Sequence, residues 1–365
     1  QLTKGHLSIV QAATGVAPAN VILTWSFSTQ SIDDTLDVVS KITTAQQTLI
    51  VPAGLTTAAV GGAGKADIYV GSTKLPYYLT PPASPTDSAA VLTKFWTAAG
   101  PPPAPLASSS RNLTMFNPVP AKVADVTVPI VVTIPRASPA SACPGKPTAG
   151  WPVVIVQHGI TGNRGQALTM ADAYADACFV VVAMDLPLHG IRQGEALFGP
   201  LYCAPTLPQC IGATERTFNV DLVNNTTGAT GPDGNVDTSG AHFINLTSPA
   251  TGRDNLRQAD ADLIQLTKSV PGLAIAPGTP APAGPIGVDP TRIHYTGLSL
   301  GAIVGGTHIK FTNDTRTATL AVPGGVITRL LLDSQTFGPR INASITAQLV
   351  LNSYNYNLFF RDFQA

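Results

Sequence analysis

The pentapeptide Gly-Leu-Ser-Leu-Gly at residues 297–301 carries the strongest chemical signal in the sequence. It matches the Gly-x-Ser-x-Gly pattern, in which a serine on a sharp turn between a strand and a helix presents its hydroxyl as a nucleophile. The context that this pattern requires is present, because residues 292–296 are predicted as a strand and residues 300–310 as a helix. Ser299 is therefore the candidate nucleophile.

Glycines flank Ser299 and recur in the helix that follows it. Gly297 and Gly301 are expected to permit a close contact between strand and helix that side chains would obstruct. Gly305 and Gly306, further along the predicted helix, are typical of a helix that packs tightly against a sheet. The simpler alternative is an ordinary strand-to-helix turn, in which the serine only caps the helix N-terminus.

A second polar loop follows the short apolar run at residues 153–156. Its sequence is Gln-His-Gly-Ile-Thr-Gly, at residues 157–162. Acyl transfer from a serine requires backbone N–H groups that stabilise the developing oxyanion. One comes from the residue after the nucleophile and one from a loop after an earlier strand. Leu300 and Ile160 occupy those two positions, so their N–H groups are the predicted oxyanion donors.

Two histidines accompany these loops. His158 and Gly159 are expected to support the oxyanion loop, and the alternative is that they only shape a connection between strand and helix. His158 precedes the serine and would lie on the oxyanion side, which argues against a role as catalytic base. His189, in the loop at residues 185–190, either faces the substrate or holds its loop by hydrogen bonds. We favour the structural role.

Strands and helices are predicted to alternate from residue 121 onward. Short runs that are apolar at every position are typical of parallel strands buried on both faces. Strands are predicted at 126–134, 153–156, 179–184, 292–296 and 317–322, and helices at 163–177, 254–270 and 300–310. This alternation predicts an α/β fold, with a mostly parallel sheet and helices on both of its faces.

The chain is predicted to contain two parts. Residues 1–120 are interpreted as a strand-rich N-terminal module, with strands at 21–28 and 66–71. Residues 121–365 are interpreted as the α/β domain. Within it, residues 190–252 lack a strong period, and we interpret them as a lid-like insertion over the carboxyl edge of the sheet, where ligands bind in such folds.

Two shorter patterns complete the prediction. Residues 75–79 contain Pro76, which favours the edge of a sheet or a loop. Arg253, Asp254 and Arg257 stand at the start of the predicted helix, where a capped and solvated first turn is the favoured interpretation.

The composition excludes several classes of protein. The 365 residues include 21 Lys plus Arg and 21 Asp plus Glu, so 12% of residues are charged and the net charge is zero. That balance argues against binding nucleic acid by neutralising phosphates. No apolar run reaches the roughly 18 residues of a membrane span. The low charge, with Thr, Ser, Asn and Gln as the polar residues, is common in exported proteins.

The four cysteines and one acidic loop suggest further contacts. Cys203 and Cys210 fit a disulfide within the insertion, and Cys143 and Cys178 either form a second disulfide or remain buried thiols. Residues 233–240 place oxygen side chains at alternate positions, which resembles the start of a calcium loop. A glycine at the sixth position and a later acidic residue are missing, so a polar turn is favoured over calcium, and no cofactor or metal is expected.

The loops around residues 157–162, 185–190 and 297–301 resemble those of α/β-hydrolases. More narrowly, they resemble bacterial extracellular lipases of the virulence-factor type, as do further stretches at 22–30, 76–79, 239–246 and 253–258. The resemblance covers the chain from about residue 20 onward. It implies a secreted or outer-membrane esterase that acts on carboxylic esters, with Ser299 as nucleophile.

The sequence departs from that family in one respect. The catalytic residues of this fold follow the order Ser, Asp or Glu, then His, and His308 is the only histidine after Ser299. His308 belongs to the helix that starts at the elbow, so it is not expected to reach the serine. We therefore expect a fragment that lacks the last strands of the domain, with the catalytic acid and histidine beyond Ala365.

The leading hypothesis is thus a secreted serine carboxylesterase or lipase, and the sequence leaves glycerides, phospholipid esters, short monoesters and synthetic polyesters open as its substrates. Its partner is expected to be a small-molecule or lipid ester, with contact at a membrane surface or lipid interface and no nucleic acid. Two alternatives stay open: thioester or amide hydrolysis on the same fold, and a non-catalytic binding module on a hydrolase scaffold.

Overall fold

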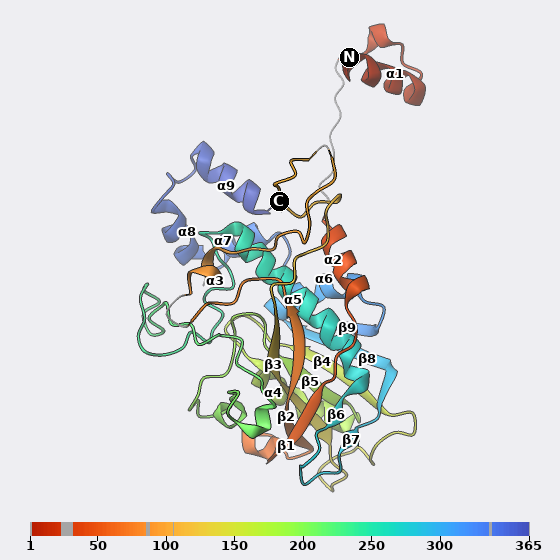
Figure 1. The fold of residues 1–365 in the computed structure, drawn as a ribbon, viewed down its shortest axis with the longest axis vertical. Coiled ribbons are helices and arrows are strands. Elements are labelled where there is room, and N and C mark those ends of the chain that lie inside the picture. The colour runs from red at the N-terminus through yellow and green to blue at the C-terminus, as the bar shows by residue number, and fades with distance from the viewer. Residues whose placement is uncertain (1, 23–31, 85–87, 105, 336–337, 365) are drawn as a thin grey trace. The chain divides into compact units, whose positions relative to one another are not determined.

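The computed structural model describes residues 2–22, 32–84, 88–104, 106–335 and 338–364 (Figure 1). The chain divides into two compact units, Gln1–Asp34 and Thr35–Ala365. The first unit contains helix α1 (Leu2–Thr14) and the 3-10 turn η1 (Pro18–Asn20). Most of the strand predicted at 21–28 falls outside the described residues.

Within the described residues of the second unit, nine strands form one sheet in the order β7-β6-β1-β2-β3-β5-β4-β8-β9. The strands are β1 (Leu49–Thr56), β2 (Ala66–Tyr77), β3 (Ala124–Pro135), β4 (Trp151–Gln157), β5 (Val180–Met184), β6 (Ala274–Ile275), β7 (Gly284–Pro285), β8 (Val288–Leu298) and β9 (Thr315–Ala321). Strands β5, β4, β8 and β9 pair in parallel, and so do β1 and β6. The pairs β1–β2, β2–β3, β3–β5 and β6–β7 are antiparallel. The sheet is therefore mixed, and its parallel half carries the Ser299 motif.

The predicted boundary at residue 120 differs from the division of the structure. Strands β1 and β2 lie in the same sheet as β3, and β2 pairs with β3 along its whole length, from Ala66 opposite Pro135 to Tyr77 opposite Ala124. Residues 35–120 are thus continuous with the α/β sheet. Strand β1 was not predicted, because Pro52 and Gly54 interrupt its apolar pattern.

Helices cover both faces of the sheet. Alternate residues of β4 point to opposite faces, so that Val153 and Ile155 contact one helical layer and Val154 and Val156 the other. The first layer contains α5 (Pro249–Ser269) and α6 (Leu300–Phe311), and the second contains α4 (Leu168–Asp176), which follows the 3-10 turn η3 (Arg164–Ala167). The α/β prediction is confirmed in this three-layer arrangement.

The end of β2 shows how a proline fits a strand. Pro76 pairs with Asp125 on β3, while the pairing between β2 and β1 ends at Ser72 opposite Leu49. Pro76 therefore has a strand neighbour on one side only, as the sequence predicted for an edge position. Its carbonyl accepts a hydrogen bond from the Gln258 amide at 3.0 Å, which fastens this edge to α5.

The remaining helices are short. They are α2 (Asp34–Ile42), α3 (Ala89–Thr93), α7 (Ile327–Asp333), α8 (Gly338–Thr346) and α9 (Tyr354–Gln364). In the C-terminal group, Ile341, Ile345 and Tyr356 form a small apolar cluster that also packs against Ile244. None of the described helices is both long and apolar enough to cross a membrane.

The stretch between β5 and α5, called here the 190–248 segment, contains only the 3-10 turns η4 (Gly199–Leu201) and η5 (Pro208–Cys210) as helical structure in its described residues. Much of it is nevertheless buried. Two of its side chains, Glu215 and Arg216, are each 2% exposed. Their partners outside the segment are Arg164 and Asp262. The segment is therefore held by buried ion pairs rather than by regular hydrogen-bond ladders.

Candidate active site

The turn at Ser299 has the backbone geometry of a nucleophile elbow. Strand β8 ends at Leu298 and α6 begins at Leu300, so Ser299 is the single residue between them. Its φ and ψ angles are 51° and −113°. A non-glycine residue at such a φ costs on the order of 1–3 kcal/mol, and such strain is concentrated at functional sites. The half-buried serine is thus held in a conformation that its own preferences would not select.

The flanking glycines are required by close contacts between backbones. A Cβ atom on Gly297 would lie 2.4 Å from the Gly301 carbonyl oxygen. A Cβ atom on Gly301 would lie 2.4 Å from the Gln157 carbonyl oxygen. Gly305 meets the Tyr295 ring in the same way, at 2.2 Å. The predicted close packing of strand, turn and helix is confirmed at these three glycines, while Gly306 faces open space.

The 157–162 loop lies directly beside the nucleophile. A Cβ atom on Gly159 would be 3.1 Å from the Ser299 Cβ atom and 3.2 Å from the Leu298 carbonyl oxygen. Leu300 is the first residue of α6, where a helix leaves its N–H groups without partners inside the helix. Ile160 follows Gly159 in the adjacent loop and is half-buried. Leu300 thus follows Ser299 directly, and the residue before Ile160, Gly159, packs against the serine.

His158 is a buried, neutral part of this loop. Its Nδ1 atom lies 2.7 Å from the Gly159 carbonyl oxygen, and its Nε2 atom accepts the Leu186 N–H at 3.0 Å. Because Nε2 accepts, the proton resides on Nδ1 and is donated to Gly159. Burial lowers the pKa of His158, in opposition to the raising effect of the nearby Asp185. With both ring nitrogens engaged, His158 supports the loop and is not a base for Ser299.

His189 is also buried. Its Nδ1 atom lies 2.9 Å from the Pro187 carbonyl oxygen, and its ring lies 5.0 Å from that of His158. Burial lowers the pKa of His189 to about 3. A Cβ atom on Gly240 would overlap the His189 ring, so the 190–248 segment needs a glycine at this point, where its φ is 68°.

His308 points away from the nucleophile, as its position in the sequence indicated. It lies eight residues along α6 from Leu300, which corresponds to about 12 Å of helix. Its Nε2 atom lies 3.2 Å from the Thr267 hydroxyl on α5, and burial lowers its pKa to about 4. Among the described residues, no hydrogen bond joins a histidine to the Ser299 hydroxyl.

One histidine–carboxylate pair was not anticipated from the sequence. His242 Nε2 lies 2.8 Å from Asp237 Oδ2, in the 190–248 segment. The same carboxylate accepts the Leu222 N–H at 2.7 Å, so Asp237 is both buried and well satisfied. The sequence alone predicts Asp237 only as part of a polar turn or calcium loop. In the sequence, only the short separation of five residues between Asp237 and His242 indicates that the two side chains could pair.

The start of α5 differs from the capped and solvated first turn that the sequence predicts at Arg253, Asp254 and Arg257. The helix begins at Pro249, five residues earlier than predicted, so Asp254 lies in its second turn. Asp254 is fully buried and accepts hydrogen bonds from the Trp96 N–H at 2.8 Å and from Arg257 at 3.0 Å. The favoured picture of a solvated first turn was wrong, because Trp96 and its loop cover this part of the helix.

The disulfide predicted between Cys203 and Cys210 is present. Of the two alternatives for Cys143 and Cys178, the structure contains the disulfide. In the part of the chain that the structure describes, no group of three or more His, Cys, Asp or Glu side chains is arranged to hold a metal ion. In the 233–240 loop, Asp233 accepts the N–H groups of Asn225 and Asn235. The loop is therefore a hydrogen-bonded turn in this structure.

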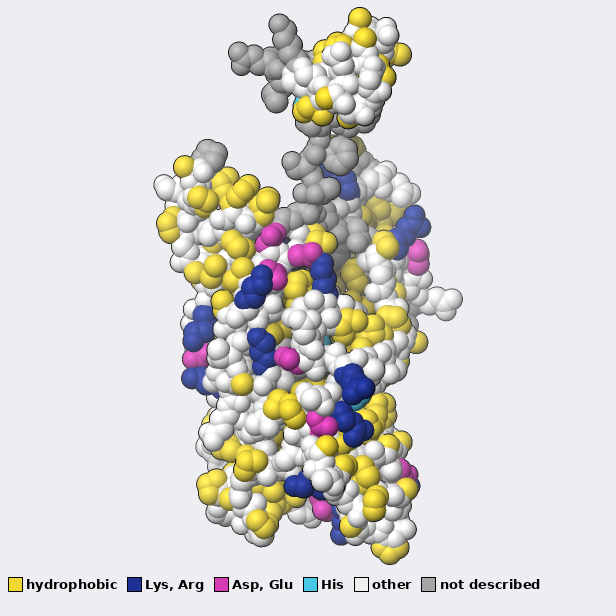
Figure 2. All heavy atoms as spheres, turned by 90° about the vertical axis from the view of Figure 1, so that its right-hand side faces the viewer, with side chains coloured by type: hydrophobic (Ala, Val, Ile, Leu, Met, Phe, Trp, Pro, Cys, Tyr) yellow, Lys and Arg dark blue, Asp and Glu magenta, His cyan; other side chains and the backbone are white. Residues whose placement is uncertain are grey.

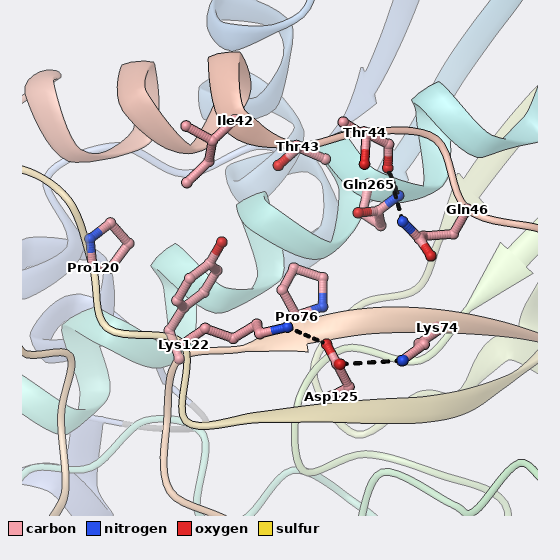
Figure 3. Close-up of a pocket in the computed structure, with 11 residues that line it drawn as sticks. Ile42, Thr43, Thr44, Gln46, Lys74, Pro76, Pro120, Lys122, Asp125 and Gln265 are labelled. Carbon is pink, nitrogen blue, oxygen red and sulfur yellow. Dashed lines mark hydrogen bonds and ion pairs between the residues drawn. The ribbon is translucent and has the colours of Figure 1, made fainter. Parts of the chain in front are cut away.

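Two pockets lie apart from the Ser299 turn. One, of about 420 Å³, lies between α2, β2, β3 and α5, where Lys74 and Lys122 both pair with Asp125 (Figure 3). Another, of about 680 Å³, lies within the 190–248 segment and is lined mainly by polar residues, Arg192 and Tyr202 among them. Neither pocket is lined by Ser299 or by the 157–162 loop.

The sheet order, the helices on both faces and the elbow after β8 define the α/β-hydrolase fold.

No protein-family model matches the chain, and no curated protein matches it. Solved structures do match. An acetyl xylan esterase from Paenibacillus sp. R4 is 12% identical, with a TM-score of 0.45, over 93% of this chain and 75% of that one. Acetyl Xylan Esterase 1 from Thermoanaerobacterium sp. is 14% identical, with a TM-score of 0.45, over 93% and 74%. A glucuronoyl esterase from Teredinibacter turnerae is 11% identical, with a TM-score of 0.30, over 78% and 47%.

Proposed function

We propose that the protein is a serine carboxylic-ester hydrolase that forms an acyl-enzyme on Ser299. The observation that carries the proposal is the strained turn at Ser299 with Gly159 packed against it. The contact supports the proposal because it brings the 157–162 loop close to the serine, next to the start of α6. An ordinary capped turn requires neither the positive φ nor the close approach of a second loop.

The proposed reaction uses residues of this chain in three roles. The Ser299 Oγ attacks the ester carbonyl carbon and gives up its proton to a base. The N–H groups of Leu300 and Ile160 stabilise the negative charge on the carbonyl oxygen. Collapse of the tetrahedral intermediate breaks the bond to the alcohol, which leaves with a proton, and water then releases the acid. No cofactor or metal is needed for these steps.

Among the described residues, His158, His294 and His308 form hydrogen bonds to groups other than the Ser299 hydroxyl. Both ring nitrogens of His158 contact Gly159 and Leu186, and His308 Nε2 contacts the Thr267 hydroxyl. His294 on β8 lies 2.6 Å from the Thr317 hydroxyl through its Nδ1 atom. We propose that the catalytic acid and base are residues other than His158, His294 and His308. The order of the triad in this fold, in which the acid and the histidine follow the serine, supports this proposal.

The finer assignment is a secreted lipase or esterase of the bacterial virulence-factor type. Its support is the sequence resemblance, together with two disulfides, which persist in oxidising compartments. Figure 2 shows charged side chains scattered among apolar and uncharged polar groups on the face drawn, which fits contact with apolar esters at a lipid interface. A polyester substrate fits the same chemistry.

Labelling with a fluorophosphonate tests the proposed function. The full-length protein is expected to gain the phosphonyl group on the peptide that contains Ser299, and Ser299→Ala is expected to abolish labelling. We expect the same variant to lower ester hydrolysis by a factor of about 10⁴ or more. Ser141→Ala, at a serine that only supports the Cys143 N–H, is the matched control and should leave both measurements unchanged.

The two other candidate functions give different results. Thioester or amide hydrolysis retains labelling at Ser299 and shows a higher kcat/KM on the corresponding substrate than on esters. A non-catalytic binding module shows no labelling of the folded wild-type protein, and this result would contradict the proposed ester hydrolase.

A further inference from the structure

The Gly159–Ile160 peptide is held by two hydrogen bonds to its carbonyl group. The Gly159 oxygen accepts the His158 Nδ1–H at 2.7 Å and the Gly162 N–H at 3.1 Å. The C=O and N–H of one peptide unit lie in a single plane and point in opposite directions. Fixing the Gly159 carbonyl therefore also fixes the direction of the Ile160 N–H, the proposed oxyanion donor.

Both ends of the 157–162 loop are attached to the residues that follow β5. At its start, His158 accepts the Leu186 N–H at 3.0 Å. At its end, the Arg164 N–H donates to Asp185 Oδ1 at 2.6 Å, and the Arg164 guanidinium pairs with the other oxygen of Asp185. The loop thus depends on the positions of two consecutive residues, Asp185 and Leu186.

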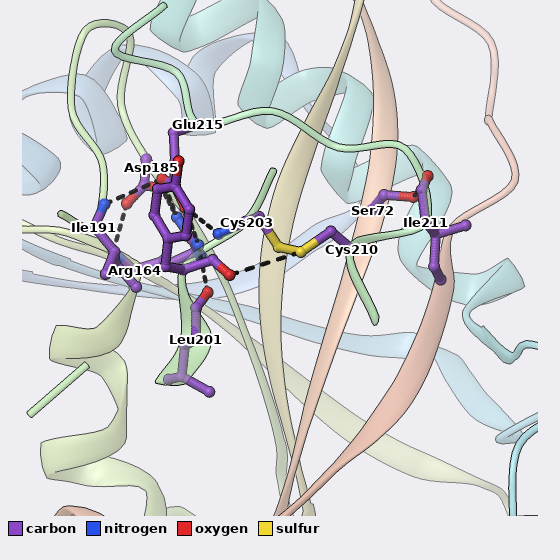
Figure 4. Close-up of a disulfide and its surroundings, with 10 residues drawn as sticks. Ser72, Arg164, Asp185, Ile191, Leu201, Cys203, Cys210, Ile211 and Glu215 are labelled. Carbon is purple, nitrogen blue, oxygen red and sulfur yellow. Dashed lines mark hydrogen bonds and ion pairs between the residues drawn. A yellow bond between two sulfur atoms is a disulfide. The ribbon is translucent and has the colours of Figure 1, made fainter. Parts of the chain in front are cut away.

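Arg164 connects this anchor to the 190–248 segment. It is 1% exposed, and it donates from Nη1 and Nη2 to Glu215 at 2.7 and 2.6 Å and from Nη2 to the Leu201 carbonyl at 2.7 Å. Figure 4 shows the guanidinium between the carboxylates of Asp185 and Glu215. A buried arginine that bridges two carboxylates is fixed in direction by its bidentate geometry.

Glu215 is surrounded by donors on both of its oxygens. Besides Arg164, it accepts the Ile191 N–H at 3.1 Å and the Cys203 N–H at 2.9 Å. Cys203 forms a disulfide with Cys210, which restrains the donor that it provides. A glutamine at position 215 would turn an NH₂ group toward some of these donors. At least two buried N–H groups would then lack a partner, which is a costly arrangement.

We propose that Glu215 is a positioning residue for the oxyanion hole, acting through Arg164 and Asp185 on the Ile160 N–H. The inference rests on the proposed ester hydrolysis. It predicts that Glu215 affects the stabilisation of the transition state and leaves substrate binding unchanged. Loss of an oxyanion donor lowers kcat by about 10²–10³, so a displaced donor is expected to lower kcat by about 10–100-fold.

The test compares Glu215→Gln with Asp254→Asn in the full-length protein. Asp254 is a matched control, because it is a fully buried carboxylate that accepts one backbone N–H and pairs with arginines away from the loop. For each variant, kcat and KM on a soluble ester are measured per folded molecule, along with deuterium uptake of the peptide covering residues 158–165. If Glu215→Gln does not fold, the same measurements are made on Glu215→Asp, which keeps the negative charge.

We expect Glu215→Gln to lower kcat by about 10–100-fold at unchanged KM and to speed exchange in residues 158–165, with an intermediate result for Glu215→Asp. Asp254→Asn is expected to keep kcat within about twofold. Equal losses of kcat in both variants, or none in either, would overturn the positioning role. A wild-type protein that is neither labelled nor active would instead refute the proposed function.

Discussion

The Ser299 turn and the 190–248 segment are held in place by different interactions. At the turn, backbones touch, and a single methyl group on Gly297 or Gly301 would overlap a carbonyl oxygen. In the segment, ion pairs and a disulfide replace regular structure, and Arg216 and Glu215 connect it to Asp262 and Arg164. The turn is fixed by steric exclusion, whereas the segment is fixed by satisfying buried charge.

This difference predicts that the two regions fail in different ways. Steric exclusion sets positions to within a few tenths of an ångström, so a small change there alters geometry before it alters stability. A buried charge that loses its partner carries a desolvation penalty, so the same size of change in the segment alters stability first. The predictions below separate these two kinds of failure.

The largest loss of stability is expected for Arg216→Met. Arg216 donates to the Asp185 carbonyl at 2.7 Å and pairs with Asp262, which is fully buried. Removing the cation leaves a buried carboxylate unpaired, which costs about 3–5 kcal/mol of unfolding free energy. Chemical denaturation measures this loss. The double variant with Asp262→Leu should regain most of it, and a double variant as unstable as the single one would contradict the ion-pair explanation.

The two disulfides are expected to contribute unequally. Cys143–Cys178 closes a loop of 35 residues and Cys203–Cys210 one of 7. Loop-closure entropy assigns about 4 kcal/mol to the first and about 2 kcal/mol to the second. Thermal unfolding of the two double-serine variants tests the order. A larger loss from the short loop would show that Cys203–Cys210 acts on the folded state, through the Glu215 contacts, more than on the unfolded chain.

At the Ser299 turn, Gly301→Ala is expected to damage activity more than stability. Its Cβ atom would displace the Gln157 and His158 carbonyls, from which it would lie 2.4 and 2.7 Å away. A displacement of about 1 Å costs about 100-fold in rate. Gly306→Ala, on the same helix with nothing within 4 Å, is the control, and it should raise stability by about 0.5–1 kcal/mol. Unchanged activity in Gly301→Ala would refute the steric argument.

The smallest effect concerns pH and His308. Burial lowers the pKa of His308 to about 4, below its ordinary value of 6.5. Between these two pKa values the unfolded chain binds a proton at His308 that the folded chain does not. The free energy of unfolding is therefore at its full value above pH 6.5 and decreases as the pH falls toward 4. From pH 6.5 to 5 the free energy of unfolding decreases by about 2 kcal/mol. Denaturation of wild type and His308→Leu over this range should show a shallower slope in the variant, and parallel slopes would contradict the prediction.

The predictability of the molecule follows the same division between regions. The sequence predicts Ser299, its flanking glycines and the strands at 153–156 and 179–184. These features were predictable because local residue spacing indicates close packing, and short apolar runs indicate burial. The contacts of Arg164 and Glu215 were not. These residues are 51 positions apart, and nothing in either local sequence distinguishes a buried ion pair from a solvated charge.

The pairing of β4 with β8 has a consequence for the folding of the protein. Val154 lies opposite His294, so the loop that ends β4 and the turn that ends β8 meet across a separation of about 140 residues. Contacts between residues so far apart in sequence slow folding, because closing the long intervening loop costs entropy before the contacts can compensate for it. We therefore expect Ser299 to gain its strained conformation late in folding. An incompletely folded chain would then carry the serine without the strained geometry on which its proposed reactivity depends.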